Sequence, residues 1–140
     1  MNLPPELLAF AAGFPLALAH LGAALAVLIV FLALYSLTSD GQEIGQIRDG
    51  NPASALVYGL TFLSIALPIG KALTGSESLI SAGLWMAAAG LSQVVLIRLA
   101  DLVLRGLSAR IRDEAEIPAA ALLGSARLAL AWLLASALQG

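Results

Sequence analysis

The sequence predicts an all-α fold, a polytopic integral membrane protein whose four transmembrane helices form two tandem parallel-repeat hairpins. Three observations support this prediction: four long apolar segments, a scarcity of charge and a weak internal repeat. The 140 residues are 60% hydrophobic and 11% charged, whereas about a quarter of the residues in a soluble domain are charged. So few polar groups could not cover the surface of a water-soluble protein of this size.

Each apolar segment is about as long as a bilayer is thick, because a spanning helix needs about 20 mostly apolar residues. The four segments run over residues 16–37, 53–73, 79–104 and 118–138. Backbone groups in lipid must be satisfied within their own segment, so each segment is expected to be a helix.

The residues before the first span favour a short helix over about 4–13. Pro4 and Pro5 suit a first helical turn, and Glu6 suits the positive end of a helix dipole. Pro15 is expected to break or kink this helix, which would then lie along the outer interface. The alternative is that the segment extends the first span.

The positions of Lys and Arg predict the orientation. Arg48 lies between the first two spans, a group of arginines (Arg105, Arg110, Arg112) lies between the last two, and only Lys71 lies on the opposite side. By the positive-inside rule, loops 38–51 and 105–117 face the cytoplasm and both termini lie outside, in the periplasm if the membrane is a bacterial inner membrane.

Both cytoplasmic loops are candidate contact surfaces. In the first, Ile44 and Ile47 would share one face of a short surface helix, beside Arg48. Asn51 followed by Pro52 is a strong start signal for the second span. In the second loop, the third helix is expected to continue past the membrane as far as Arg112.

A shift of 65 residues makes the two halves of the chain partly coincide. The coinciding pairs are mainly small residues: Asn51 with Glu116, Ala55 with Ala120, Gly59 with Gly124, Ala66 with Ala131, and Gly70 with Ala135. The implied repeats cover about 14–74 and 78–138. Each is one hairpin of two spans, and both point the same way, which makes the repeat parallel.

The small residues also predict where helices pack, because close backbone approach drives helix association in lipid. One stripe lies on the second span, one on the fourth, and Gly83, Ala87 and Gly90 form a third on the third span. These stripes would serve either assembly of the bundle within one chain or contact with other copies.

The stretch from Ile47 to Leu56, with Gly59 and the run 66–69, resembles the bacterial inner-membrane family called domain of unknown function 350, the YjfL-like proteins. The family shows an Ile-x-x-Gly-Asn step, then an alanine-rich helix that ends in Leu-Pro. Its second half has a Gly-Glu step, which here reads Ala115-Glu116, so the glycine is missing. The resemblance covers about 28–138 and implies a four-span membrane protein, often a tandem duplication, with no assigned activity. Relatives are often encoded near phage-shock-type peripheral membrane proteins, which implies an envelope-associated assembly.

Arg127 is the outstanding polar residue, because it lies near the centre of the fourth span, where a charge is costly. Gln93, Ser64 and the carbonyl that Pro68 leaves free lie at a similar depth. Three alternatives follow. Arg127 is an interior tie to these groups, or it contacts an anion, lipid headgroup or partner carboxylate, or it snorkels from a lipid-facing site.

Arg98 and Asp101 lie three residues apart near the cytoplasmic end of the third span, where they can form a local ion pair. A proton or ion relay is the alternative role. Counted along the helices, Asp101 is expected to be too shallow to meet Arg127 without a water or a tilt.

The chain lacks the residues that several classes of function need. The chain has no cysteine and one histidine, so no catalytic, cofactor-binding or metal site is expected, and an enzyme is not expected. A net charge of −2 gives no support for nucleic-acid binding. No carboxylate lies at mid-membrane, which argues against a proteolipid rotor subunit or a small multidrug antiporter.

The function expected is that of an oligomeric structural or scaffolding subunit of a bacterial envelope complex. Its partners would be membrane lipid, other copies of the chain, and a cytoplasmic or membrane protein. The alternative is a channel or transporter subunit in which Arg127, Gln93 and Pro68 line an oligomeric pathway.

Overall fold

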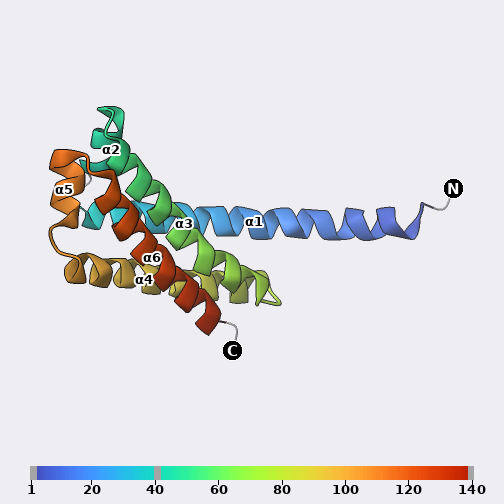
Figure 1. Ribbon diagram of the computed structural model, residues 1–140. Coiled ribbons are helices and arrows are strands. Elements are labelled where there is room, and N and C mark those ends of the chain that lie inside the picture. The colour runs from blue at the N-terminus through green and yellow to red at the C-terminus, as the bar shows by residue number, and fades with distance from the viewer. Residues whose placement is uncertain (1–2, 40–41, 139–140) are drawn as a thin grey trace.

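The computed structural model describes residues 3–39 and 42–138, which form six helices and no strand. Four helices are long and apolar enough to cross a membrane: α1 (Pro5–Thr38), α3 (Pro52–Thr74), α4 (Leu79–Val103) and α6 (Ile117–Ala137). Two short helices, α2 (Gln42–Arg48) and α5 (Leu107–Glu114), lie together at one end of the bundle, called here the α2–α5 end (Figure 1). The predicted all-α class is confirmed, and by length and composition the chain is a multi-pass membrane protein.

The first helix continues through Pro15, so a break there is wrong and the alternative, that residues 5–13 extend the first span, is confirmed. At about 1.5 Å per residue, its 34 residues measure about 51 Å, against about 30 Å for a hydrocarbon core. Every described residue before His20 is exposed. This half of α1 extends beyond the rest of the molecule (Figure 1).

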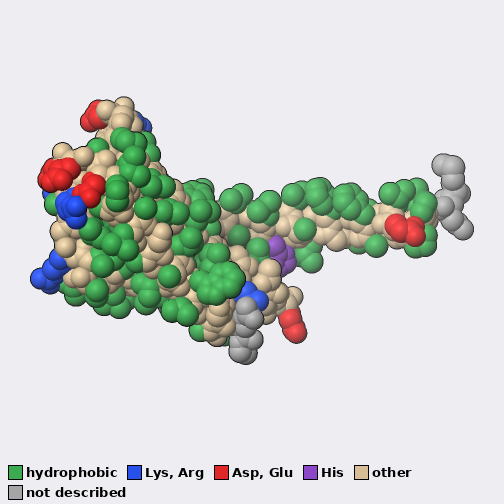
Figure 2. Space-filling model, viewed as in Figure 1, with side chains coloured by type: hydrophobic (Ala, Val, Ile, Leu, Met, Phe, Trp, Pro, Cys, Tyr) green, Lys and Arg blue, Asp and Glu red, His purple; other side chains and the backbone are tan. Residues whose placement is uncertain are grey.

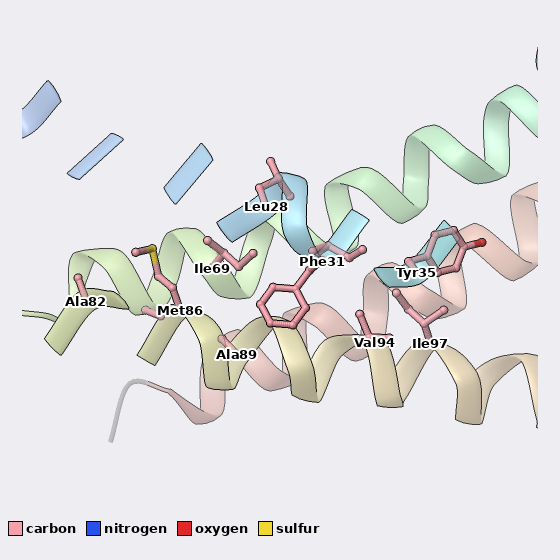
Figure 3. Packing of buried hydrophobic residues seen from close by; sticks show 11 residues of the cluster. Leu28, Phe31, Tyr35, Ile69, Ala82, Met86, Ala89, Val94 and Ile97 are labelled. Carbon is pink, nitrogen blue, oxygen red and sulfur yellow. The ribbon is translucent and has the colours of Figure 1, made fainter. Parts of the chain in front are cut away.

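The other half of α1 packs on α3 and α4. Leu28, Phe31 and Tyr35, on one face of the helix, join a buried cluster with residues such as Ile69 and Met86 (Figure 3). The Phe31 ring lies directly on the α4 backbone, since a Cβ at Gly90 would lie 2.3 Å from it. Absence of a side chain at Gly90 therefore sets how closely α1 and α4 approach.

The most extensive helix pairing joins α3 and α6. A Cβ at Gly124 would lie 2.4 Å from Leu60, so α6 presents bare backbone to α3. The predicted packing stripe of α6 is buried throughout (Ala120, Gly124, Ala131, Ala135). The matching stripe of α3 is mostly unpacked within the chain, because Ala55, Gly59 and Gly70 are exposed and only Ala66, which is half-buried, packs against the core cluster. The stripe of α4 is mixed, since Gly83 is half-buried, Ala87 exposed and Gly90 buried.

The third span does not continue to Arg112 as expected. It ends at Val103, and the chain turns through Gly106 at φ +91°, a conformation that glycine adopts without strain. The separate helix α5 then buries Ile111 against α3 and α6. The turn thus places α5 over the ends of two spans.

Asn51 joins the two loops at this end. Its Oδ1 accepts the Ser54 backbone N–H at 3.0 Å and caps α3, while its Nδ2 donates to the Ile111 carbonyl at 2.9 Å. The start signal read at Asn51 and Pro52 is confirmed. The same side chain holds α3 and α5 together.

Candidate functional site

Arg127 lies near the middle of α6 and is 2% exposed. Side chains of a helix lean toward its N-terminus, so Arg127 extends toward the α2–α5 end, where α6 begins. A buried guanidinium must have acceptors for its donors, and this one meets three other spans.

The guanidinium of Arg127 binds one residue on each of α4, α1 and α3. Its Nε and Nη2 donate to Asp101 Oδ1 at 3.1 and 2.6 Å. Its Nη1 donates to the Tyr35 hydroxyl at 2.9 Å and to Thr61 Oγ1 at 2.6 Å. One side chain therefore ties four helices together.

Asp101 and Arg127 meet directly, and the tilt that this contact was expected to need is present, because α6 crosses α4 obliquely (Figure 1). The two helices are antiparallel neighbours, and each side chain leans toward the start of its own helix. Arg127 thus extends toward the α2–α5 end while Asp101 extends away from it, and their atoms meet directly.

The predicted pair of Arg98 and Asp101 is confirmed, with Arg98 Nη1 donating to Asp101 Oδ2 at 3.1 Å. The pair is not merely local, because Arg98 Nη2 also donates to the Tyr35 carbonyl at 2.9 Å and Arg98 donates to the Thr38 hydroxyl. Asp101 is therefore shared by two guanidinium groups, one from its own helix and one from α6.

Tyr35 extends the network to α2. Its hydroxyl donates to Glu43 Oε1 at 2.6 Å. The other oxygen, Glu43 Oε2, is buried and has no hydrogen-bond partner among the described residues. Burial raises the pKa of Glu43, although the bond from Tyr35 and the charges of Arg127 and Arg98 oppose this shift.

The remaining span residues predicted for the site lie apart from the guanidinium of Arg127. Gln93 is buried and its Nε2 donates to the backbone carbonyl of Arg127 at 3.2 Å, so it contacts the main chain of that residue. The Ser64 hydroxyl donates to the Thr61 carbonyl at 2.8 Å within α3. Pro68 is buried about one turn after Ser64 along α3. The predicted interior tie exists, but its acceptors are Asp101, Tyr35 and Thr61.

The predicted loop contacts are divided between surface and interior. Ile44 and Arg48 are exposed, and Ile47 is half-buried. Asn51 is engaged in the cap and the bond to α5 described above. Residues 40 and 41 of the same loop lie outside the described residues.

A polar cavity of about 250 Å³ adjoins the network at the α2–α5 end. Its lining includes charged residues from α2, α4, α5 and α6 (Glu43, Arg98, Asp101, Arg112, Arg127). Within the described part of the chain, no three His, Cys, Asp or Glu side chains lie close enough to hold a metal ion. The site is therefore a network of hydrogen bonds and charges beside a small cavity. Charged side chains gather at this end on the face shown in Figure 2.

The sequence reasoning missed Tyr35, Thr61 and Glu43. One signal was available, because a tyrosine hydroxyl near the end of an apolar span needs a hydrogen-bond partner when it is buried. The identity of that partner could not be read, since Glu43 belongs to a helix in the following loop.

These features define a four-span membrane protein with a buried guanidinium network at one end. A family model, Domain of Unknown Function (DUF350), matches residues 9–138. The chain belongs to this family, as the resemblance indicated; the YjfL-like and bacterial designations stay predictions. No curated protein and no solved structure matches the chain.

Proposed function

We propose that this protein is a structural or scaffolding subunit of a bacterial envelope complex, and that it presents the α2–α5 end to a protein partner. The observation that carries the proposal is the position of Arg127, whose donors are directed at acceptors of α1, α3 and α4 inside the chain. A guanidinium engaged in this way favours a rigid bundle rather than an ion path.

The surface of the α2–α5 end suits contact with a protein. Ile44 and Arg48 are exposed on α2. Exposed Arg110 of α5 pairs with half-buried Glu116, the residue before α6, and their nearest charged atoms are 2.6 Å apart. Mixed charge beside an exposed isoleucine suits a protein helix better than an anionic membrane surface, which would favour a basic run.

The proposed setting is the inner membrane, with the α2–α5 end in the cytoplasm and both termini outside. The support is the charge bias, because Arg48, Arg105, Arg110 and Arg112 lie at this end and Lys71 lies at the other. A duplication of one hairpin is supported by the order of elements, since a short helix precedes both α3 and α6. The exposed stripe of α3 supports assembly with other copies.

The scaffold proposal is tested by photo-crosslinking in native membranes. A crosslinker at Ile44 should trap a defined protein in stoichiometric amount, and the same group at Ile80, which is 80% exposed near the opposite end, should not. The charge reversal Arg48→Glu should dissociate that protein during purification. Adducts from Ile80 alone, or none from Ile44, would contradict the proposal.

A channel or transporter subunit is the second candidate, and the polar cavity beside Arg127 favours it. Liposomes containing the purified protein should then show ion flux above empty liposomes, and Arg127→Lys should reduce this flux. Equal flux in protein-containing and empty liposomes would exclude this candidate and leave the scaffold proposal intact.

A further inference from the structure

The cavity at the α2–α5 end has an uneven balance of charge. Arg98 and Arg127 share the single carboxylate of Asp101, with Arg98 on Oδ2 and Arg127 on Oδ1. Arg112 adds a third guanidinium to the lining, and its only partner among the described residues is Asp113 beside it. Asp113 offsets Arg112, so Asp101 alone faces Arg98 and Arg127 and leaves one positive charge in excess.

Two neutral donors of lining residues have no acceptor in the described part of the chain. Ser108 and Gln46 line the cavity, and the Ser108 hydroxyl and the Gln46 amide nitrogen make no hydrogen bond to a residue that the structure describes. The Gln46 amide oxygen is already engaged by the Ser54 hydroxyl at 2.7 Å. These neutral donors add to the guanidinium groups as partners for an acceptor-rich ligand.

Glu43 decides whether the charge is balanced. The groups that face it are Tyr35 of α1, Arg98 and Asp101 of α4, and Arg127 of α6, while α5 brings Arg112 to the lining and α3 brings neutral side chains. An ionised Glu43 would offset one guanidinium, and a neutral Glu43 would leave the excess in place. Its buried and unpartnered Oε2 favours the neutral form, because an ionised oxygen without a donor is costly to bury.

We propose that this cavity binds a small anionic group of carboxylate or phosphate size, and that Glu43 must be neutral for the group to bind. The ligand is either a soluble anion or the headgroup of an anionic lipid, since both offer the same chemistry. The inference goes beyond scaffolding, because it concerns what the cavity holds and needs neither a protein partner nor ion flux.

Sulfate is a suitable probe because its charge is the same at pH 5.5 and pH 8. Titration calorimetry of the full chain in nanodiscs of zwitterionic lipid should show sulfate binding that is tighter at pH 5.5 by on the order of tenfold, from removal of one nearby charge. Glu43→Gln should bind sulfate equally at both pH values. Glu114→Gln, which removes a charge from an exposed position outside the lining, should keep the pH dependence.

A second variant keeps the test decisive if Glu43→Gln fails to fold. Ser108 is exposed at the cavity. Ser108→Asp therefore adds a negative charge with little structural cost and should abolish sulfate binding, whereas Ser108→Asn should retain it.

Nanodiscs with phosphatidylglycerol then distinguish a lipid headgroup from a soluble anion as the source of the ligand. Competition with sulfate identifies a headgroup, and lack of competition identifies a soluble anion. Absence of binding of both sulfate and phosphatidylglycerol at pH 5.5, or equal sulfate affinity in Ser108→Asp and wild type, would overturn the inference.

Discussion

The helices α3 and α6 carry matching patterns of small residues in opposite environments. On α6, Gly124 contacts Leu60 of α3 and the rest of its stripe is buried. On α3, a Cβ at Gly59 or Gly70 would meet nothing within 4 Å. A small-residue pattern thus shows that a backbone can be approached closely, but it does not show which partner approaches it.

The two helices also differ at positions 62 and 127, which the 65-residue shift aligns with each other. Arg127 of α6 coincides with Phe62 of α3, which is exposed. Helix α3 contributes the neutral hydroxyl of Thr61 to the network, whereas α6 contributes its charge. The buried charge makes α6 the centre of the site.

Replacement of Arg127 should have the largest effect on stability. Arg127→Met removes the donors to Asp101 Oδ1, the Tyr35 hydroxyl and Thr61 Oγ1, while Arg98 stays on Asp101 Oδ2. Loss of one partner from a buried ion pair costs about 3–5 kcal/mol. The matched change Phe62→Met should alter the unfolding free energy by less than about 0.5 kcal/mol, as at other exposed positions. Reversible unfolding by SDS in mixed micelles measures both. Similar losses for the two variants would show that the charge is not what distinguishes the helices.

The two glycines provide the next largest contrast. Gly124→Leu must displace Leu60 and separate α3 from α6, and overpacking of this kind costs about 1–3 kcal/mol. Gly59→Leu should not destabilise the single chain, because open space surrounds this residue and leucine is a better helix former than glycine. If Gly59→Leu lowers the mass of the assembly measured in native detergent, the α3 stripe is a contact between copies of the chain.

The residues that precede the two helices give a smaller contrast. Asn51 caps α3 and also donates to the Ile111 carbonyl, so Asn51→Ala should cost about 1 kcal/mol. Glu116 makes no side-chain cap at α6 and pairs with the exposed Arg110. The pair is partly open to solvent, with the side chains 52% and 25% exposed, and solvent-screened pairs contribute about 0–1 kcal/mol, so Glu116→Ala should have the weaker effect. A larger loss for Glu116→Ala in the same SDS unfolding assay would reverse this comparison.

The sequence predicted the elements better than the contacts between them. Apolar length is a local property, so the four spans could be read directly, as could the start of α3 at Asn51 and Pro52. Proline was a poor guide at Pro15, where α1 continues. A lost hydrogen bond and a ring clash do not end a long apolar helix when lipid favours the helical state.

The candidate site was predicted in part. Arg127, Arg98 and Asp101 could be chosen because charges in apolar segments are rare, but their meeting depends on side-chain direction, which a count of residues along each helix ignores. Tyr35 and Glu43 were missed because their contact depends on how the first loop folds back over the bundle.

The smallest expected effect concerns the pH dependence that Glu43 gives to α2. Burial raises the pKa of Glu43 above its ordinary value, so the folded protein binds the proton more tightly than the unfolded chain does. The stability that this proton provides is present at low pH and is lost as the pH rises from the ordinary pKa through the raised one. Thermal unfolding in detergent between pH 4 and pH 8 should therefore show a decrease in melting temperature that Glu43→Gln removes and Glu114→Gln keeps. A wild-type melting temperature that increases over this range would mean that the attraction of Arg127 and Arg98 for ionised Glu43 outweighs the cost of its burial.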